Sequence, residues 1–167
     1  MEYGSEFCHD CGKLEIIETS FEAVHDMWSR YLWPGRQDIR PMSSMTDAEN
    51  IDMTIYEKYE PTFWAVYIKN RDTNDLELIG CNSGHRTAER IYRSRGLYVD
   101  QDYRGNGIAQ MLLRRLLIKA KLENCHTVWT LPRKESLRAY IAAGFEQRSE
   151  FFGTDTSNAN CYAVAEL

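Results

Sequence analysis

The sequence has no long hydrophobic run and no excess of positive charge, and each absence excludes a class of protein. No stretch of its 167 residues reaches the ~18 uncharged apolar residues that a membrane helix needs, and the first residues lack the apolar core of a signal peptide. Lys and Arg number 20 against 25 Asp and Glu, so the formal net charge is −5. This balance argues against a nucleic-acid binder that works through a broad basic surface. We therefore expect a cytoplasmic protein with no membrane and no nucleic-acid partner.

Paired cysteines, internal repeats and long linkers rich in Pro, Gly or Ser are also missing. The five cysteines are an odd number and mostly isolated, which fits reduced thiols. Cys8 and Cys11 have the spacing of half a zinc site, but no second Cys-x-x-Cys follows, so we expect no metal. We expect a single domain over residues 14–167. Residues 1–13 are expected to be a cloning remnant or flexible leader, since Gly4-Ser5-Glu6-Phe7 is what two adjacent cloning sites encode.

Hydrophobic periodicity predicts a mixed α/β domain with the order β-α-α-β-β-β-α-β-α-β-β. Strands are expected at 14–18, 63–68, 76–80, 90–99 and 126–131, with two more toward the C-terminus. Helices are expected after Thr19, near Thr46, along 109–120 and along 133–143. Gly96 interrupts the 90–99 strand, which favours a bulge or a close ligand approach; a barrel-like bend without catalytic meaning is the alternative.

A glycine-containing turn, Tyr103-Arg104-Gly105-Asn106-Gly107-Ile108-Ala109, leads from the 90–99 strand into the strongest amphipathic helix. The first N–H groups of a helix have no partner within it, and the helix dipole adds positive charge there. The two glycines permit a positive φ, and Arg104 is a fork donor for phosphate oxygens. The segment therefore predicts a pyrophosphate site, with a tight corner without ligand as the alternative. The dinucleotide and Walker fingerprints both fail, because Gln110 replaces the third glycine and no Gly-Lys-Ser/Thr follows.

Two segments of the chain together resemble the GNAT superfamily of N-acetyltransferases. Arg104-x-x-Gly107-x-Ala109 matches the family's acetyl-CoA motif, and Tyr140-Ile141-Ala142-Ala143-Gly144-Phe145 is similar to its Tyr-x-x-x-Gly-Phe signature. The resemblance covers roughly 14–167, with motif agreement confined to 97–145. It implies an α+β GNAT-like fold, in which about four helices flank a central, mostly antiparallel, twisted sheet of about 6–7 strands.

The resemblance implies an acetyl-CoA-dependent N-acetyltransferase with no metal. It would move an acetyl group to a primary amine of a small molecule or protein, by direct attack in a ternary complex. The alternative is a catalytically weak or inactive CoA-binding module that acts as a sensor or interaction domain. The sequence leaves a homodimer open.

The resemblance also assigns roles to particular residues. Backbone N–H groups of Arg104, Gly105, Asn106, Gly107, Ile108 and Ala109 would bind the CoA pyrophosphate. Main-chain atoms of Leu97 and Val99 would pair with the pantetheine arm, and one of their N–H groups would stabilise the oxyanion. Tyr140 would be the general acid that protonates the thiolate, with a packed helix aromatic as the alternative. Ser136, one helical turn earlier, would line the same channel.

Arg133 stands where many relatives carry an asparagine, and we expect it either to reach a CoA phosphate or to face water. No motif in the sequence identifies the general base. Glu89 is the nearest carboxylate, with a solvated strand-end glutamate as the alternative, while Asp100 and His85 are weaker candidates. A route through water would leave no trace in the sequence. Arg93 and Arg95 favour either an anionic acceptor or a solvated strand face.

Overall fold

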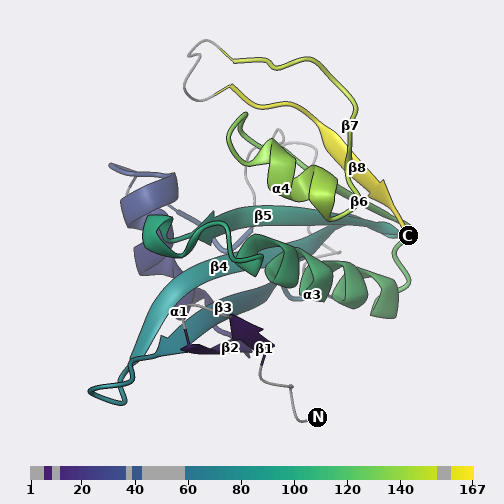
Figure 1. Cartoon of the computed structure of the whole chain (residues 1–167). Coiled ribbons are helices and arrows are strands. Elements are labelled where there is room, and N and C mark those ends of the chain that lie inside the picture. The colour runs from purple at the N-terminus through teal and green to yellow at the C-terminus, as the bar shows by residue number, and fades with distance from the viewer. Residues whose placement is uncertain (1–5, 9–11, 37–38, 43–58, 154–158) are drawn as a thin grey trace.

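The computed structural model describes residues 6–8, 12–36, 39–42, 59–153 and 159–167 (Figure 1). The helix expected near Thr46, and Cys11 of the Cys-x-x-Cys segment, lie outside the described residues. None of the described helices is both long enough and apolar enough to cross a membrane.

One eight-stranded sheet organises the chain, with the strand order β1-β2-β3-β4-β5-β6-β8-β7. Its strands are β1 (Glu6–Cys8), β2 (Gly12–Thr19), β3 (Thr62–Lys69), β4 (Leu76–Ala88), β5 (Ile91–Val99), β6 (Thr127–Thr130), β7 (Glu146–Gln147) and β8 (Ala163–Glu166). The sequence predicted about 6–7 strands, and the additional one is β1, which pairs with β2 inside the segment expected to be a leader. Strand β4 is much longer than the expected 76–80, because it continues to a two-residue turn at Glu89 and Arg90.

The sheet is mostly antiparallel, as expected. Strands β5 and β6 run parallel, because the helix α3 (Ile108–Leu122) carries the chain from the end of one back to the start of the other. The 3-10 turn η3 (Gln101–Tyr103) precedes α3, and α4 (Leu137–Ala142) follows β6. Helix α1 (Phe21–Met27) continues into the π-helical turn η1 (Trp28–Leu32).

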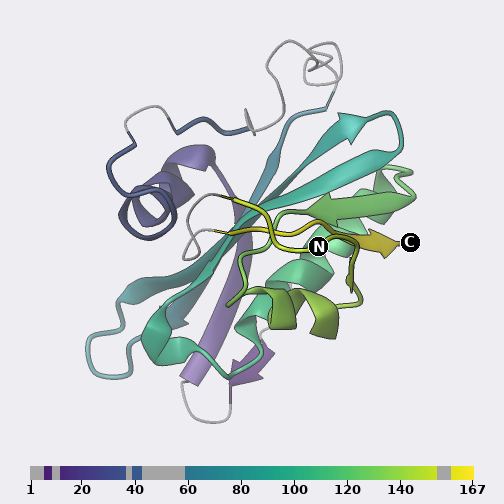
Figure 2. The same cartoon turned by 90° about the horizontal axis from the view of Figure 1, so that it is seen from above.

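Helices cover both faces of the sheet, and each face has its own core. Helices α3 and α4 lie on one face and α1 with η1 on the other, as Figure 2 shows from above. Under α3 the buried side chains are those at helical spacing, namely Ile108, Leu112, Leu113, Leu116 and Ala120. Under α1 a second cluster contains Val24, Met27, Trp28, Ile39, Phe63 and Cys81. The layers and the mostly antiparallel sheet confirm the mixed α+β fold predicted from the sequence, and the described elements follow the predicted order approximately, with β1 as an additional strand.

Candidate active site

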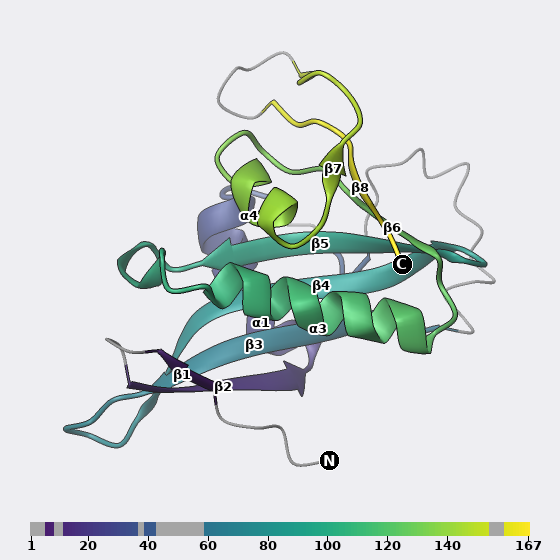
Figure 3. The ribbon, with the colours of Figure 1, turned by 45° about the vertical axis from the view of Figure 1, so that its right-hand side comes forward.

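Strands β5 and β6 part halfway along the sheet. They pair only from Ile91↔Thr127 to Arg93↔Trp129, and β6 ends one residue later. Strand β5 continues to Val99 with β4 as its partner. From Ser94 onward, β5 therefore has no paired strand on the β6 side among the described residues. In Figure 3, β5 is seen between α4 above it and α3 below it. We call the region where β5 runs unpaired beside the β6–α4 connection the β5–β6 gap.

Gly96 forms a bulge at the edge of the β5–β6 gap, as the sequence predicted. The register of β4 and β5 shifts between Cys81↔Tyr98 and Ser83↔Arg95, and Gly96 has a φ of +74°. Three atoms of the Trp28 indole lie closer than 3.0 Å to the position that a Cβ on residue 96 would take. Only glycine fits both the left-handed conformation and this contact.

The main chain of β5 beyond the bulge exposes hydrogen-bonding groups to the gap. The Asp100 N–H donates to the Ile79 carbonyl at 2.7 Å, so Asp100 faces β4. In an antiparallel pair, alternate residues turn their N–H and C=O groups away from the partner strand. The groups of Leu97 and Val99 therefore point away from β4, toward the gap. The Val99 carbonyl accepts a bond from Arg104 Nε at 2.9 Å.

The loop before α3 turns a helix N-terminus toward the same end of β5. Gly105 and Gly107 have φ values of +83° and +77°, and Gly107 is the N-cap residue of α3. The Asn106 side chain donates to the Tyr103 carbonyl at 3.0 Å, which closes the loop on itself. The N–H groups of the first helical turn, which includes Ile108 and Ala109, have no partner within the helix. This geometry suits a phosphate group.

The Arg104 side chain is turned back onto β5. Besides the bond to Val99, its guanidinium lies 5.6 Å from the centre of the Tyr98 ring. In this structure Arg104 therefore braces the loop against β5. The anion-binding groups that the loop presents are those of the backbone.

Tyr140 points into the β5–β6 gap from α4. Its side chain is 3% exposed, and its hydroxyl lies 3.4 Å from the Ser94 hydroxyl, just beyond the last β5–β6 pair. Burial raises the pKa of Tyr140, and hydrogen bonds to Ser94 and Thr130 and the charge of Arg93 oppose part of that shift. The phenol therefore remains protonated at neutral pH and can donate a proton. Its ring also packs edge-on against Phe145 at 5.2 Å, so the packing and the placed hydroxyl coexist.

Arg133 is held against η1 rather than extended into water. Its guanidinium is partly buried and donates to the Leu32 carbonyl at 2.8 Å. It thus joins the β6–α4 connection to the end of η1, which differs from the solvent-facing expectation; a contact with a CoA phosphate stays a prediction. The Ser136 hydroxyl donates to the Arg133 carbonyl at 3.1 Å and stabilises the turn before α4.

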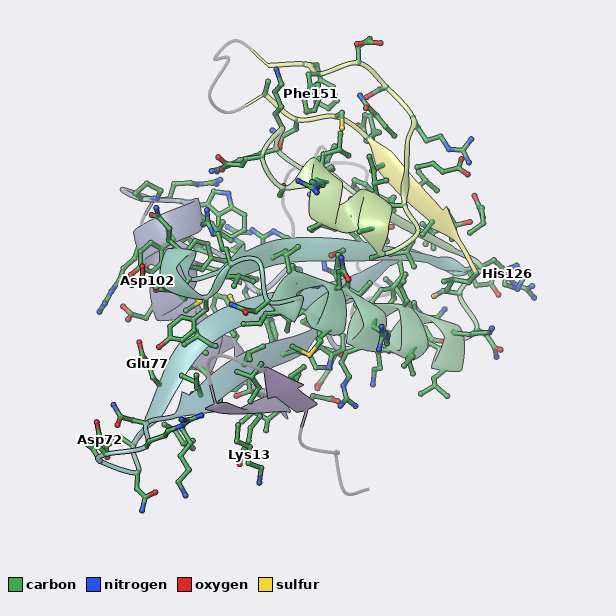
Figure 4. The ribbon with its side chains drawn as sticks, in the orientation of Figure 1. Lys13, Asp72, Glu77, Asp102, His126 and Phe151 are labelled. Atoms are coloured by element: carbon green, nitrogen blue, oxygen red, sulfur yellow. The ribbon has the colours of Figure 1, made fainter. Side chains whose placement is uncertain are left out.

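Glu89 lies far from this constellation. It occupies the β4–β5 turn, where its carbonyl accepts a bond from Arg86. Its neighbour Arg90 contacts His126, which Figure 4 places at the opposite end of the molecule from Asp102. At about 3.3 Å per strand residue, Glu89 is roughly 20 Å from Gly96. The expectation of Glu89 as base is corrected for this reason, since the start of β5 is the wrong end of the strand.

The two weaker candidates for a general base, His85 and Asp100, also lie in surroundings that do not suit this role. Burial, followed by the positive charges of Arg93 and Arg95, lowers the pKa of His85 to about 3, which makes its imidazole a weak base. The Asp100 carboxylate accepts a bond from the Asp102 N–H at 3.0 Å and caps η3.

The arginines of β5 lie on the face opposite α4 and are not solvated. Arg93 and Arg95 are 3% and 7% exposed. The Arg93 guanidinium lies 4.5 Å from the Trp129 ring centre, and that of Arg95 lies 4.5 Å from the Trp33 ring centre. Arg95 also donates to the Arg40 carbonyl at 2.8 Å. These contacts correct the expectation of a solvated strand face.

An open groove of about 460 Å³ lies beside the α3 loop, near the β3–β4 hairpin. It is lined by Ile68, Lys69, Asn70, Arg71, Glu77, Asp102, Tyr103 and Asn106. Its walls carry charges of both signs, and Tyr103 donates to Glu77 across it at 3.2 Å. Leu97, Val99 and Tyr140 do not line this groove, so it is separate from the β5–β6 gap. Among the described residues, no group of His, Cys, Asp and Glu side chains is arranged to hold a metal ion.

Three residues beside the gap were missed by sequence reasoning. Ser94 contacts Tyr140, Asn82 lies 3.4 Å from the Ser94 hydroxyl, and Trp28 donates to the Gly96 carbonyl at 2.9 Å. The sequence signal that could have identified Ser94 and Asn82 is that both are polar residues at core-facing positions of neighbouring strands. Nothing in the sequence pairs Trp28 with Gly96, because 68 residues separate them.

Comparison with known proteins agrees with this fold. The family model described as Acetyltransferase (GNAT) family matches residues 24–145. A Lactobacillus plantarum protein assigned as an N-acetyltransferase has a TM-score of 0.63 and 16% identity over 92% of this chain and 98% of its own. A GNAT-family acetyltransferase from Staphylococcus aureus Mu50 has a TM-score of 0.59 and 18% identity over the same shares. One chain of a NatC complex bound to Gag peptide and CoA has a TM-score of 0.62 and 17% identity, again over 92% and 98%. Comparison with curated proteins found no matching sequence.

Proposed function

The chain belongs to the GNAT family of acetyltransferases, and from this premise we propose that it transfers the acetyl group of acetyl-CoA to a primary amine. The acceptor is a small molecule or a protein, and the amine attacks the thioester directly in a ternary complex. The observation that carries the proposal is the β5–β6 gap, which has the Gly96 bulge on one side and the buried Tyr140 hydroxyl on the other.

The pyrophosphate and the pantetheine arm of acetyl-CoA each have a fitting partner along this path. The N-terminus of α3, with Gly105 and Gly107 in its loop, suits the pyrophosphate. The outward-facing backbone groups of Leu97 and the N–H of Val99 suit the amides of the pantetheine arm, which would lie beside β5 like an added strand. The NatC structure to which this chain is similar contains CoA, which supports the same donor here.

The reaction forms an N–C bond and breaks the C–S bond of the thioester. A neutral amine attacks the carbonyl carbon, and the Leu97 N–H donates to the developing oxyanion. Tyr140 gives its proton to the departing thiolate, because its raised pKa keeps the phenol protonated. The nitrogen releases one proton to water, and the tyrosinate recovers one from water, so the protons balance. The displaced position of Glu89 favours water as the acceptor of the amine proton.

The test has two stages. Acetyl-CoA is first titrated against the protein, and a rise in melting temperature is expected because the ligand binds the native state. Thiol release is then followed with a panel of primary amines, including polyamines, amino sugars and N-terminal peptides. Release above the rate of the no-amine control supports the enzyme. Binding without release for any amine supports the CoA-binding module instead, and no melting shift at millimolar acetyl-CoA rejects both.

A further inference from the structure

Trp28 is bonded to the bulge from the face opposite Tyr140. It opens η1, is 0% exposed, and its Nε1–H donates to the Gly96 carbonyl at 2.9 Å. The ring is held by edge-on or tilted contacts with Phe21, Trp33 and Phe63 at 5.2 to 5.9 Å. The indole N–H is therefore a fixed donor rather than a mobile one.

The geometry of one peptide unit connects this bond to the β5–β6 gap. The Gly96 carbonyl and the Leu97 N–H belong to the same peptide group, and no described peptide bond is cis. In a trans peptide the C=O and N–H bonds point in opposite directions. With the carbonyl directed at Trp28 on the α1 side, the Leu97 N–H points away from α1 and toward the gap that Tyr140 enters from α4.

A glycine-containing bulge needs such an anchor, because glycine allows a peptide group to rotate with little steric penalty. A rotated 96–97 peptide would present its carbonyl oxygen to the thioester oxygen, and the two would repel each other. The Cys81 thiol, 3.7 Å from the Gly96 carbonyl, adds a weaker donor on the same side. Burial raises the pKa of Cys81 to about 12, so the thiol keeps its proton.

We propose that Trp28 is a positioning residue for catalysis, whose indole N–H fixes the Gly96–Leu97 peptide so that the Leu97 N–H is aimed at the thioester carbonyl. The inference rests on the proposed function and assigns a role to a residue that does not contact the substrate. Donors that are already oriented before the reaction stabilise an oxyanion without reorganisation. The energetic effect of Trp28 is therefore expected in the transition state, and acetyl-CoA affinity should change little.

The test is the carbonyl stretching frequency of bound acetyl-CoA, labelled with ¹³C at the thioester carbonyl and measured by isotope-edited infrared spectroscopy. In the unaltered protein we expect a lower frequency than in free acetyl-CoA, because a hydrogen bond polarises the carbonyl. Trp28→Phe keeps an aromatic ring and removes the N–H, so the frequency should return toward the free value. The matched control is Trp129→Phe, which also removes an indole N–H, one that donates to Thr87 instead of Gly96, and should keep the frequency of the unaltered protein.

Steady-state kinetics give a second readout. Trp28→Phe should lower kcat by roughly tenfold to a hundredfold, part of the loss seen when an oxyanion donor is deleted, with KM for acetyl-CoA nearly unchanged. If Trp28→Phe fails to fold, 3-benzothienylalanine incorporated at position 28 keeps the bicyclic shape without the N–H.

The outcomes separate the two proposals. A bound carbonyl whose frequency is lowered in the unaltered protein and restored in the position-28 variant supports the inference. A bound carbonyl with the same frequency in both proteins, or with no shift in the unaltered protein, overturns it while binding and turnover remain intact. If no bound carbonyl band appears in any protein, the proposed function fails, and this inference fails with it.

Discussion

Replacing Gly96 by alanine tests whether the bulge and its contact with Trp28 are as close as the structure indicates. Two separate penalties are expected. The residue has a φ of +74°, which L-residues with a Cβ adopt at a cost of about 1–2 kcal/mol. The new methyl group would also overlap the Trp28 indole, which is fully buried and cannot move into solvent.

The magnitude follows from adding these two penalties. Overpacking of a filled core typically costs about 1–3 kcal/mol, so the free energy of unfolding should fall by about 2–5 kcal/mol. With a urea m-value of about 2 kcal/mol per molar, the unfolding midpoint should fall by roughly 1–2.5 M. This loss is a large fraction of the stability of an ordinary domain.

Urea unfolding followed by circular dichroism measures the effect. Gly35→Ala is the matched control, because Gly35 has a φ of +80° and nothing within 4 Å of the added methyl group. The control should lose only the backbone penalty of about 1–2 kcal/mol. If Gly96→Ala unfolds at the same urea concentration as Gly35→Ala, the contact between Trp28 and the bulge is refuted.

Three further predictions concern the gap and its surroundings. Tyr140→Phe should lower kcat about a hundredfold or more and leave the affinity for acetyl-CoA unchanged. The variant should also lack the decline in kcat that we expect above pH 10 when the phenol of Tyr140 loses its proton. Unaltered turnover under conditions where chemistry limits the rate would refute the acid role. Between pH 6.5 and pH 3 the imidazole of residue 85 binds a proton in the unfolded state but not in the buried, folded state. The free energy of unfolding should therefore fall on acidification by up to about 1.4 kcal/mol per pH unit, and more steeply than in His85→Gln. Equal slopes of the two proteins in urea titrations across this pH range would contradict the prediction. Arg133→Met should destabilise the fold by about 1–3 kcal/mol, because the Leu32 carbonyl loses its hydrogen-bond donor. The affinity for acetyl-CoA, measured by calorimetry, should stay the same. A loss of affinity without a loss of stability would instead support the interpretation that Arg133 binds a CoA phosphate.

Local patterns were sufficient for most of the fold. The apolar spacing of residues 109–120 predicted α3 and its buried face, because helical periodicity is set within a few turns. Boundaries that depend on other elements were less accurate. Strand β4 extends eight residues beyond its expected end, since pairing with both β3 and β5 stabilises polar residues such as Asn82 and Ser83 inside the sheet.

The glycine-containing loop before α3 was the most predictable part of the candidate site. Gly105 and Gly107 take the positive φ values expected of them, because a strand–turn–helix corner is local in sequence. Glu89 was misplaced for the opposite reason. Its position next to a strand was correct, but the direction of that strand relative to the bulge is a property of the whole sheet.

The sequence alone determined the class of this protein: its charge, its motifs at Arg104–Ala109 and Tyr140–Phe145, and the alternation of strands and helices each depend on neighbouring residues. Only the tertiary structure decided which side chains meet. It buried the positively charged side chains of Arg93 and Arg95 against tryptophans, turned Arg133 to a backbone carbonyl, and placed Trp28 on Gly96. These contacts join residues far apart in the chain, and their energies depend on burial and direction, which no short stretch of sequence encodes.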